Sequence, residues 1–128
     1  MKIASVLENQ KIEKRIAITP EIVKKYTALG IKIYLKENYG SHLGIKDREY
    51  LDLGVKISKS DEEIVENSDI VVQLGMLNDD KVLKLKENQT LIGVLNPYEN
   101  KDKLESLSKK KINLFSLELL PRISRAQS

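Results

Sequence analysis

Cysteine is absent from this 128-residue chain, and histidine occurs once, as His42. Without cysteine the chain can form no disulfide bond, no thiolate nucleophile and no thiolate metal site. A single histidine also excludes a multi-histidine metal cluster. We therefore expect no bound metal ion.

Long hydrophobic runs are missing as well. No apolar stretch approaches the roughly 20 residues that a membrane helix requires. The N-terminus opens directly into a strand-like pattern, without the hydrophobic region of a signal peptide. We expect no membrane span and a cytoplasmic location, which is compatible with membership of a membrane-associated complex.

The sequence also lacks both common loops that cradle phosphate groups. Neither G-x-G-x-x-G nor G-x-x-x-x-G-K-S/T occurs in the chain. A sheet of the class that often binds dinucleotides is therefore expected to lack the turn that would bind one by itself.

The excess of positive charge is small. Net charge is +3, because 18 lysines and four arginines, together 22 cations, are interspersed with 19 acidic residues. Such a balance is weak evidence for a nucleic-acid partner. The one dense basic run, 109–111, sits where a helix should end, and cations there complement the helix dipole. We expect no nucleic-acid partner.

Strand-like and helix-like segments alternate along the chain. Short apolar runs predict strands at 3–7, 31–35, 55–57, 69–74, 90–95 and 112–117, and amphipathic patterns predict helices at 20–29, 47–53, 60–67, 79–85 and 101–110. Continuous apolar strands separated by amphipathic helices favour a doubly wound, mostly parallel α/β sheet with helices on both faces. We expect residues 1–128 to form one domain of flavodoxin-like or Rossmann-like type.

Local signals predict where several helices begin and which side chains face inward. Thr19 is the expected N-cap of the first helix, with Pro20 at its first position. Ser60 and Glu63 have the spacing of a capping box. The inward positions are expected to be Ile22, Val23, Tyr26, Leu29, Val82, Leu85, Leu104 and Leu107.

In such sheets, ligands bind outside the carboxyl ends of the strands. Three of the four arginines lie in these loops, Arg15 in one and Arg122 and Arg125 in another. Where lysine is the usual cation, arginine indicates a need for a planar group with several donors. Arg15 either clamps a carboxylate or phosphate as a bidentate fork or forms a surface salt bridge that holds its loop.

Other polar residues at these ends have simpler explanations. His42 is expected to be a solvated loop histidine rather than a general base. Asn96 either hydrogen-bonds a ligand or makes a turn. The paired acids Asp79 and Asp80 fit a helix N-terminus better than a metal site. No residue receives a catalytic role.

Four segments together carry a family resemblance. They are 15–21 (RIAITPE), 69–72 (DIVV), 90–97 (TLIGVLNP) and, above all, 118–128 (ELLPRISRAQS). The chain resembles the N-terminal domain of the alpha subunit of proton-translocating NAD(P) transhydrogenases, a domain that alanine dehydrogenases share. The resemblance runs the whole length, and the last segment is specific to the transhydrogenase branch.

The resemblance implies one lobe of an NAD(H)-binding component, with a Rossmann lobe following. Hydride would pass between NAD(H) there and NADP(H) on the beta subunit, coupled to proton movement. Arg122 and Gln127 match the arginine and glutamine of the family's nicotinamide-side loop, and Arg15 matches its N-terminal arginine. Expected partners are the beta subunit, the rest of the alpha subunit and a second copy in a homodimer. The loop's aspartate and serine would follow Ser128, so we expect the domain to be incomplete and inactive alone.

Two departures separate the chain from alanine dehydrogenases. Those enzymes carry a substrate-binding lysine and a catalytic histidine where this chain has Gly75 and Asn96, which disfavours that activity. The loop 75–78 also departs from a pattern common to both branches. An alternative is a non-catalytic module of a split or truncated subunit that docks a partner or forms a dimer. A receiver-like signalling domain is disfavoured, because Glu8 alone is no acidic cluster after the first strand, and the strand 69–74 does not end in an aspartate.

Overall fold

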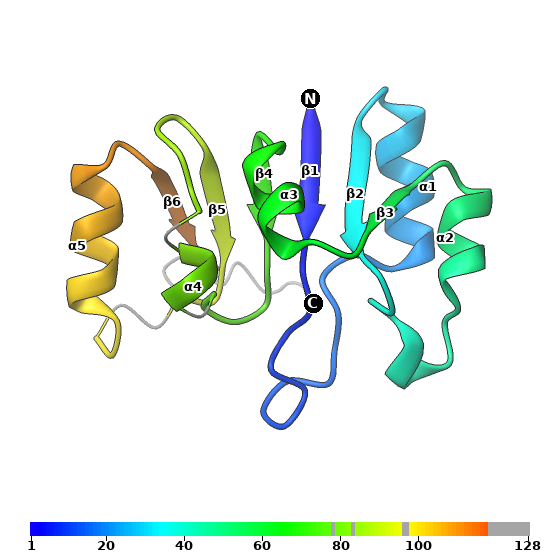
Figure 1. Ribbon diagram of the computed structural model, residues 1–128, viewed down its shortest axis with the longest axis horizontal. Helices are drawn as coiled ribbons and strands as arrows, with labels where there is room; N and C mark the ends of the chain where they lie inside the picture. Colours follow the sequence, from blue (N-terminus) through cyan, green and yellow to red (C-terminus); the bar gives the residue numbers. More distant parts are fainter. Residues whose placement is uncertain (78, 83, 96–97, 118–128) are drawn as a thin grey trace, which may run out of the picture.

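Six short parallel strands form one sheet in the computed structural model, which describes residues 1–77, 79–82, 84–95 and 98–117. The spatial order is β3-β2-β1-β4-β5-β6, with the chain crossing from one half of the sheet to the other between β3 and β4 (Figure 1). The strands are β1 Lys2–Ser5, β2 Lys32–Lys36, β3 Lys56–Ser58, β4 Ile70–Val72, β5 Thr90–Gly93 and β6 Asn113–Ser116.

Helices connect the strands and cover both faces of the sheet. They are α1 Pro20–Ala28, α2 Asp47–Asp52, α3 Asp61–Glu66, α4 Asp79–Val82 and α5 Lys101–Lys109, and a 3-10 turn, η1, spans Ser41–Leu43. The predicted alternation and parallel sheet are confirmed. Among the described residues, no helix is long and apolar enough to cross a bilayer.

Alternation of side chains along each strand divides the core into two clusters. Ile3, Ile33 and Leu35 pack with Val23 of α1 and Tyr50 of α2 on one face. The opposite face packs against α3 and α5, and its buried set is Ala4, Val6, Ile64, Val65, Val71, Leu77, Leu85, Leu91, Leu95, Leu107 and Ile112. On the first face, Val94 and Phe115 near the β5–β6 edge are exposed.

Most helix ends follow the predicted local chemistry. The Thr19 side chain accepts a hydrogen bond from Ile22 N at the start of α1, with Pro20 in the first turn. Gly54, after α2, has φ of +92°, a conformation that costs glycine little. Leu85 and Leu107 are buried as expected, although α4 ends at Val82 and Leu85 lies outside it.

Two local predictions were wrong. Leu29 was placed on the inner face of α1 but is 76% exposed, because the helix ends at Ala28 and Leu29 is its C-cap. At α3, Ser60 caps the helix by accepting from Glu63 N, but Glu63 does not return the bond. Ser58 replaces it: its hydroxyl accepts from Ser60 N and donates to the Glu63 carboxylate.

Candidate functional site

A cavity of about 490 Å³ opens where the chain leaves β1 and β4. In this strand order the connections from β1 and β4 run to opposite sides of the sheet, which makes their carboxyl ends the usual place for a ligand. Leu7, Ile12, Met76 and Leu77 supply apolar walls. The loop after β1 projects beyond the ends of the strands at this point (Figure 1). The volume is that of a small-molecule pocket.

Gln73 forms the polar inner wall of this cavity by pairing with the backbone of Val6, the residue that follows β1. Its Oε1 accepts from Val6 N at 2.8 Å, and its Nε2 donates to Val6 O at 3.1 Å. The side-chain amide therefore continues the β1–β4 ladder past its last backbone pair, Ala4 and Val71. Gln73 is 2% exposed, so its orientation is fixed by these partners.

A buried hydroxyl network links Gln73 to the loop that carries Arg15. The Tyr39 oxygen accepts from Ala17 N and Ile18 N at 3.1 and 3.2 Å and lies 2.8 Å from Ser5 Oγ. Ser5 directs its proton toward Val72 O or Gln73 Oε1, at 2.6 and 2.9 Å. Because Ser5 has one proton, Tyr39 is the donor of the bond that joins the two hydroxyls.

The same loop is held from a second side. Tyr50 donates to Ile18 O at 2.7 Å, and its ring meets that of Tyr39 edge to face, with centroids 6.1 Å apart. Burial raises the pKa of both phenols above the usual value, so both stay neutral donors at ordinary pH. The loop backbone that follows Arg15 is thus fixed by two buried tyrosines.

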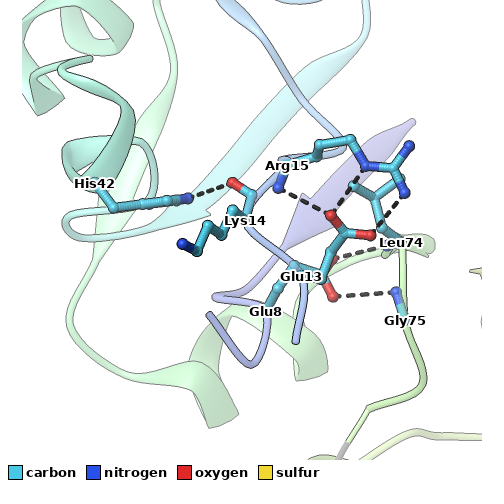
Figure 2. Close-up of polar contacts among 7 residues, drawn as sticks. All are labelled: Glu8, Glu13, Lys14, Arg15, His42, Leu74 and Gly75. Carbon is cyan, nitrogen blue, oxygen red and sulfur yellow. Dashed lines mark hydrogen bonds and ion pairs between the residues drawn. The ribbon is translucent and has the colours of Figure 1, made fainter. Parts of the chain in front are cut away.

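Glu8 points its carboxylate at the start of the β4–α4 connection (Figure 2). Its Oε2 accepts from Leu74 N at 2.7 Å and Gln73 Nε2 at 2.9 Å, and its Oε1 accepts from Gly75 N at 3.1 Å. The side chain is half-buried, and none of the described cations forms an ion pair with it. Burial raises the pKa of Glu8, the nearby Glu13 charge adds to the rise, and the backbone donors oppose it.

Arg15 makes a bidentate pair within its own loop (Figure 2). Its Nε and one terminal nitrogen donate to the two oxygens of Glu13 at 3.0 and 2.8 Å, and its backbone N donates to the same carboxylate at 2.9 Å. The Arg15 side chain is 80% exposed. These hydrogen bonds lower the pKa of Glu13 to about 2. The described residues that line the cavity include Glu13 but not Arg15.

His42, in η1, ties down the same loop from the far side. Its Nε2 donates to Lys14 O at 2.6 Å (Figure 2), and its Nδ1 accepts from Gln10 Nε2 at 3.2 Å. The exposed histidine is thus a loop clamp, and it is not among the described residues that line the cavity.

Residues 5–128 match a protein family described as alanine dehydrogenase/PNT, N-terminal domain. The chain belongs to this family. A Rhodospirillum rubrum protein named as the first portion of NAD(P) transhydrogenase subunit alpha is 36% identical, over 100% of this chain and 35% of that protein. Alanine dehydrogenase 1 of Staphylococcus aureus (strain Mu50 / ATCC 700699) is 27% identical, over 99% of this chain and 34% of that protein.

A solved structure shows the same fold. The transhydrogenase from Sinorhizobium meliloti superimposes with a TM-score of 0.89 at 24% identity, over 99% of this chain and 38% of that one. The chain spans 34–35% of the length of the two sequence relatives. The whole-length resemblance that the sequence motifs predicted is therefore confirmed at the level of the family.

The predicted site residues of this family domain are only partly within the described stretches of the chain. Arg122, Gln127 and Asn96 lie outside the described residues. Arg15 adopts the salt-bridge arrangement that the sequence offered as one of its two alternatives, and its role toward a ligand stays a prediction. Gly75 does reach the cavity, where its N–H contacts Glu8.

No metal centre stands out in the portion of the family domain that the structure describes. No group of three or more metal-binding side chains gathers there. Asp79 begins α4, as the helix-start interpretation predicted. Lys81 lines the cavity, and its Nζ lies 3.5 Å from Asp61 Oδ2. The polar contacts at the site are therefore hydrogen bonds and ion pairs.

Sequence reasoning missed the residues that build the inner wall. Ser5 and Gln73 are single polar residues inside apolar runs, and Glu8 directly follows the first of these runs. A buried polar side chain must find hydrogen-bond partners. A polar residue that interrupts an apolar run was therefore the available signal. It could not identify the partners of Ser5, which are Tyr39 and Gln73, 34 and 68 residues away.

Proposed function

We propose that this chain forms one lobe of the NAD(H)-binding component of a proton-translocating NAD(P) transhydrogenase. Hydride would pass between NAD(H) on this component and NADP(H) on the beta subunit, coupled to proton movement through the membrane portion. The observation that supports this most is whole-chain similarity, at 36% identity, to the Rhodospirillum rubrum transhydrogenase alpha-subunit protein. Similarity to alanine dehydrogenase 1 is lower, at 27%.

The cavity supports a division of labour between two lobes. It lies at the ligand edge of a dinucleotide-type sheet, yet the chain has no glycine loop for phosphates. The nicotinamide cofactor supplies the hydride chemistry when it is bound. The residues of this lobe would orient its reactive end, and the apolar walls at Leu7, Ile12 and Met76 would exclude water there.

Three arginine or glutamine side chains have proposed roles. Arg122 would donate hydrogen bonds to the amide or a phosphate of the cofactor, and Gln127 would position the nicotinamide. Arg15 would have to leave Glu13 before it could bind an anionic group, because Glu13 occupies two of its donors. Arg15 is therefore the weakest of the three assignments.

Alanine dehydrogenase activity is not proposed. Gly75 supplies no ammonium group beside Glu8, and residue 96 is asparagine rather than histidine. Without these groups the site has neither the second cation for a substrate carboxylate nor the expected proton donor. The lobe would instead act with the rest of the alpha subunit and the beta subunit, as a homodimer at the cytoplasmic side of an inner membrane.

Reconstitution tests this proposal. Purified chain is mixed with NADH, an NADP analogue and the soluble domain of the beta subunit, and analogue reduction is followed by absorbance. We expect no turnover from this mixture, and turnover once the remainder of the alpha subunit is added. Persistent inactivity of the complete mixture would contradict the proposed function. Equal turnover without this chain would favour a non-catalytic docking role instead.

A further inference from the structure

Half of the sheet's first face lies outside the cover of the described helices. The connections from β1 to β2 and from β2 to β3 run through α1 and α2, which pack on this face beside β2 and β3 (Figure 1). From β4 the chain moves the other way along the sheet, to β5 and β6. Because parallel crossovers are right-handed, this reversal also moves the helices to the opposite face. None of the described helices therefore covers the first face at β5 and β6.

The side chains on this part of the first face are apolar. Ile92 and Phe115 are register partners on β5 and β6, and Val94 and Leu117 occupy the next first-face positions. Phe115 is 57% exposed, Leu117 40% and Val94 36%. None of these four described residues belongs to either core cluster. We call them the uncovered patch, and because parallel sheets are normally covered on both faces, we expect it to pack against a partner.

The uncovered patch continues the first-face core across the sheet. Val72 of β4 pairs with Ile92 of β5, and Ile92 pairs with Phe115 of β6. Val72 packs against the first-face cluster, Ile92 is half-buried without belonging to it, and Phe115 is exposed. Burial thus falls strand by strand away from α1 while the side chains stay apolar. This gradient indicates a missing covering layer rather than a polar outer surface.

A single helix fits the uncovered patch better than a second copy of the chain. The exposed fractions of Val94, Phe115 and Leu117 amount to roughly 250 Å², given about 200 Å² for a whole aromatic side chain. A stable interface between two proteins buries about 800 Å² on each. β5 and β6 are each 4 residues long, or about 13 Å. A helix of 9 residues, the length of α1 and of α5, spans about the same distance.

The relatives contain polypeptide that could supply such a helix. The chain spans 35% of the Rhodospirillum rubrum protein and 34% of alanine dehydrogenase 1, so roughly two thirds of each lies outside the matched region. We propose that the uncovered patch docks an amphipathic helix from the remainder of the alpha subunit, whose apolar stripe packs on Phe115 and Leu117. The inference rests on the proposed function, because that function supplies the remainder of the subunit as a partner.

Thiol labelling tests the docking, because the chain has no cysteine of its own. Phe115→Cys is treated with a maleimide, alone and together with the remainder of the alpha subunit, and labelling at residue 115 is followed by mass spectrometry. We expect labelling to be at least about tenfold slower in the mixture, because the thiol then reacts only when the helix opens locally. Glu105→Cys, exposed on α5, should label at one rate in both samples. Unchanged labelling at residue 115, or equal slowing at both positions, would overturn the inference.

A charge placed in the uncovered patch should weaken docking. Phe115→Asp should bind the remainder of the alpha subunit at least about tenfold more weakly by calorimetry, because docking would bury an unpaired carboxylate. Leu51→Asp is the matched control, since Leu51 is 50% exposed on α2, and it should keep the original affinity. Circular dichroism verifies that both variants are folded. Equal affinities of the two folded variants would refute the assignment.

Other occupants of the uncovered patch give different results. A dimer of the isolated chain in sedimentation, lost in Phe115→Asp, would assign the patch to a second copy and overturn the inference. Protection of Phe115→Cys by the soluble domain of the beta subunit alone would overturn it as well.

The labelling and the reconstitution can fail separately. Turnover in the reconstituted complex, together with unprotected Phe115→Cys, would remove only the docking surface. Protection of Phe115→Cys in a mixture that never supports turnover would keep the docking surface and reject the transhydrogenase assignment.

Discussion

Glu8 and Glu13 are five positions apart in one loop, yet the protein holds their carboxylates in opposite ways. Glu8 is half-buried among neutral donors and its pKa is raised, mainly by burial. Glu13 is also partly buried, with 22% of its side chain exposed, but Arg15 donates two side-chain hydrogen bonds to it, and its pKa falls to about 2. Hydrogen bonds from neutral donors therefore do not outweigh burial at Glu8, whereas hydrogen bonds from the Arg15 guanidinium and backbone dominate at Glu13.

The two carboxylates mark two regions with different energetics. We call Ser5, Glu8, Tyr39 and Gln73 the loop base, and Gln10, Glu13, Arg15 and His42 the loop tip. The loop base satisfies buried polar groups, and an unpaired buried group costs about 1–3 kcal/mol. The loop tip consists of exposed contacts, which individually contribute little to stability because water screens them. Equivalent substitutions should therefore cost far more at the base.

Replacing Gln73 should have the largest effect. Gln73→Met keeps much of the side-chain volume but leaves Val6 N and Val6 O without their partner, and Glu8 loses one donor. We expect the free energy of unfolding to fall by about 4 kcal/mol, measured by urea denaturation. Gln10→Met makes the same chemical change at the loop tip and should cost less than about 0.5 kcal/mol. A similar loss of unfolding free energy in both variants would contradict the energetic distinction between the loop base and the loop tip.

Gly93→Ala should destabilise the loop base through the backbone of Gln73. A Cβ at Gly93 would lie 2.4 Å from Gln73 O, so the backbone of β5 or of Gln73 would have to shift. We expect a loss of about 3 kcal/mol in the free energy of unfolding. Gly75→Ala is the matched control, because its Cβ meets only Glu8 Oε1, at 3.5 Å. An unchanged urea midpoint in Gly93→Ala would mean that this approach is looser than the structure indicates.

Tyr39→Phe should cost less, about 2 kcal/mol, because Ala17 N and Ile18 N lose their acceptor while the ring remains. Hydrogen exchange at these two amides should become faster in the variant. Tyr26→Phe removes a hydroxyl from a half-buried ring on α1 and should leave both stability and exchange nearly unchanged. Unaltered exchange at Ala17 and Ile18 in Tyr39→Phe would argue against the hydroxyl link.

The sequence predicted the sheet well and the loop base poorly, for one physical reason. Strand and helix positions follow from local periodicity and caps, such as Thr19 at α1 and Gly54 after α2. Leu29 failed because the pattern does not show at which turn a helix stops. The contacts of Gln73 depend on how β1 and β4 are juxtaposed, 67 residues apart for the Val6 pair. Local patterns do not carry that information.

The pH dependence of stability should show the two carboxylates acting in opposite directions. Glu8 has a folded pKa above its ordinary value of 4.5, so the folded state binds more protons and stability falls as pH rises from about 4.5 to the folded value. Glu13 has a folded pKa of about 2, so its contribution is present above about pH 4.5 and is lost as pH falls toward 2.

Urea midpoints measured across these two pH ranges separate the contributions. Glu8→Gln should flatten the decline above about pH 4.5 and leave the acid limb intact, whereas Glu13→Gln should flatten only the acid limb. Both changes should be the smallest of those predicted, because water screens the exposed pair and backbone donors offset the burial of Glu8. Identical effects of the two variants on the urea midpoints would mean that both carboxylates experience the same surroundings. That result would contradict the division between loop base and loop tip, because Glu8 and Glu13 define it.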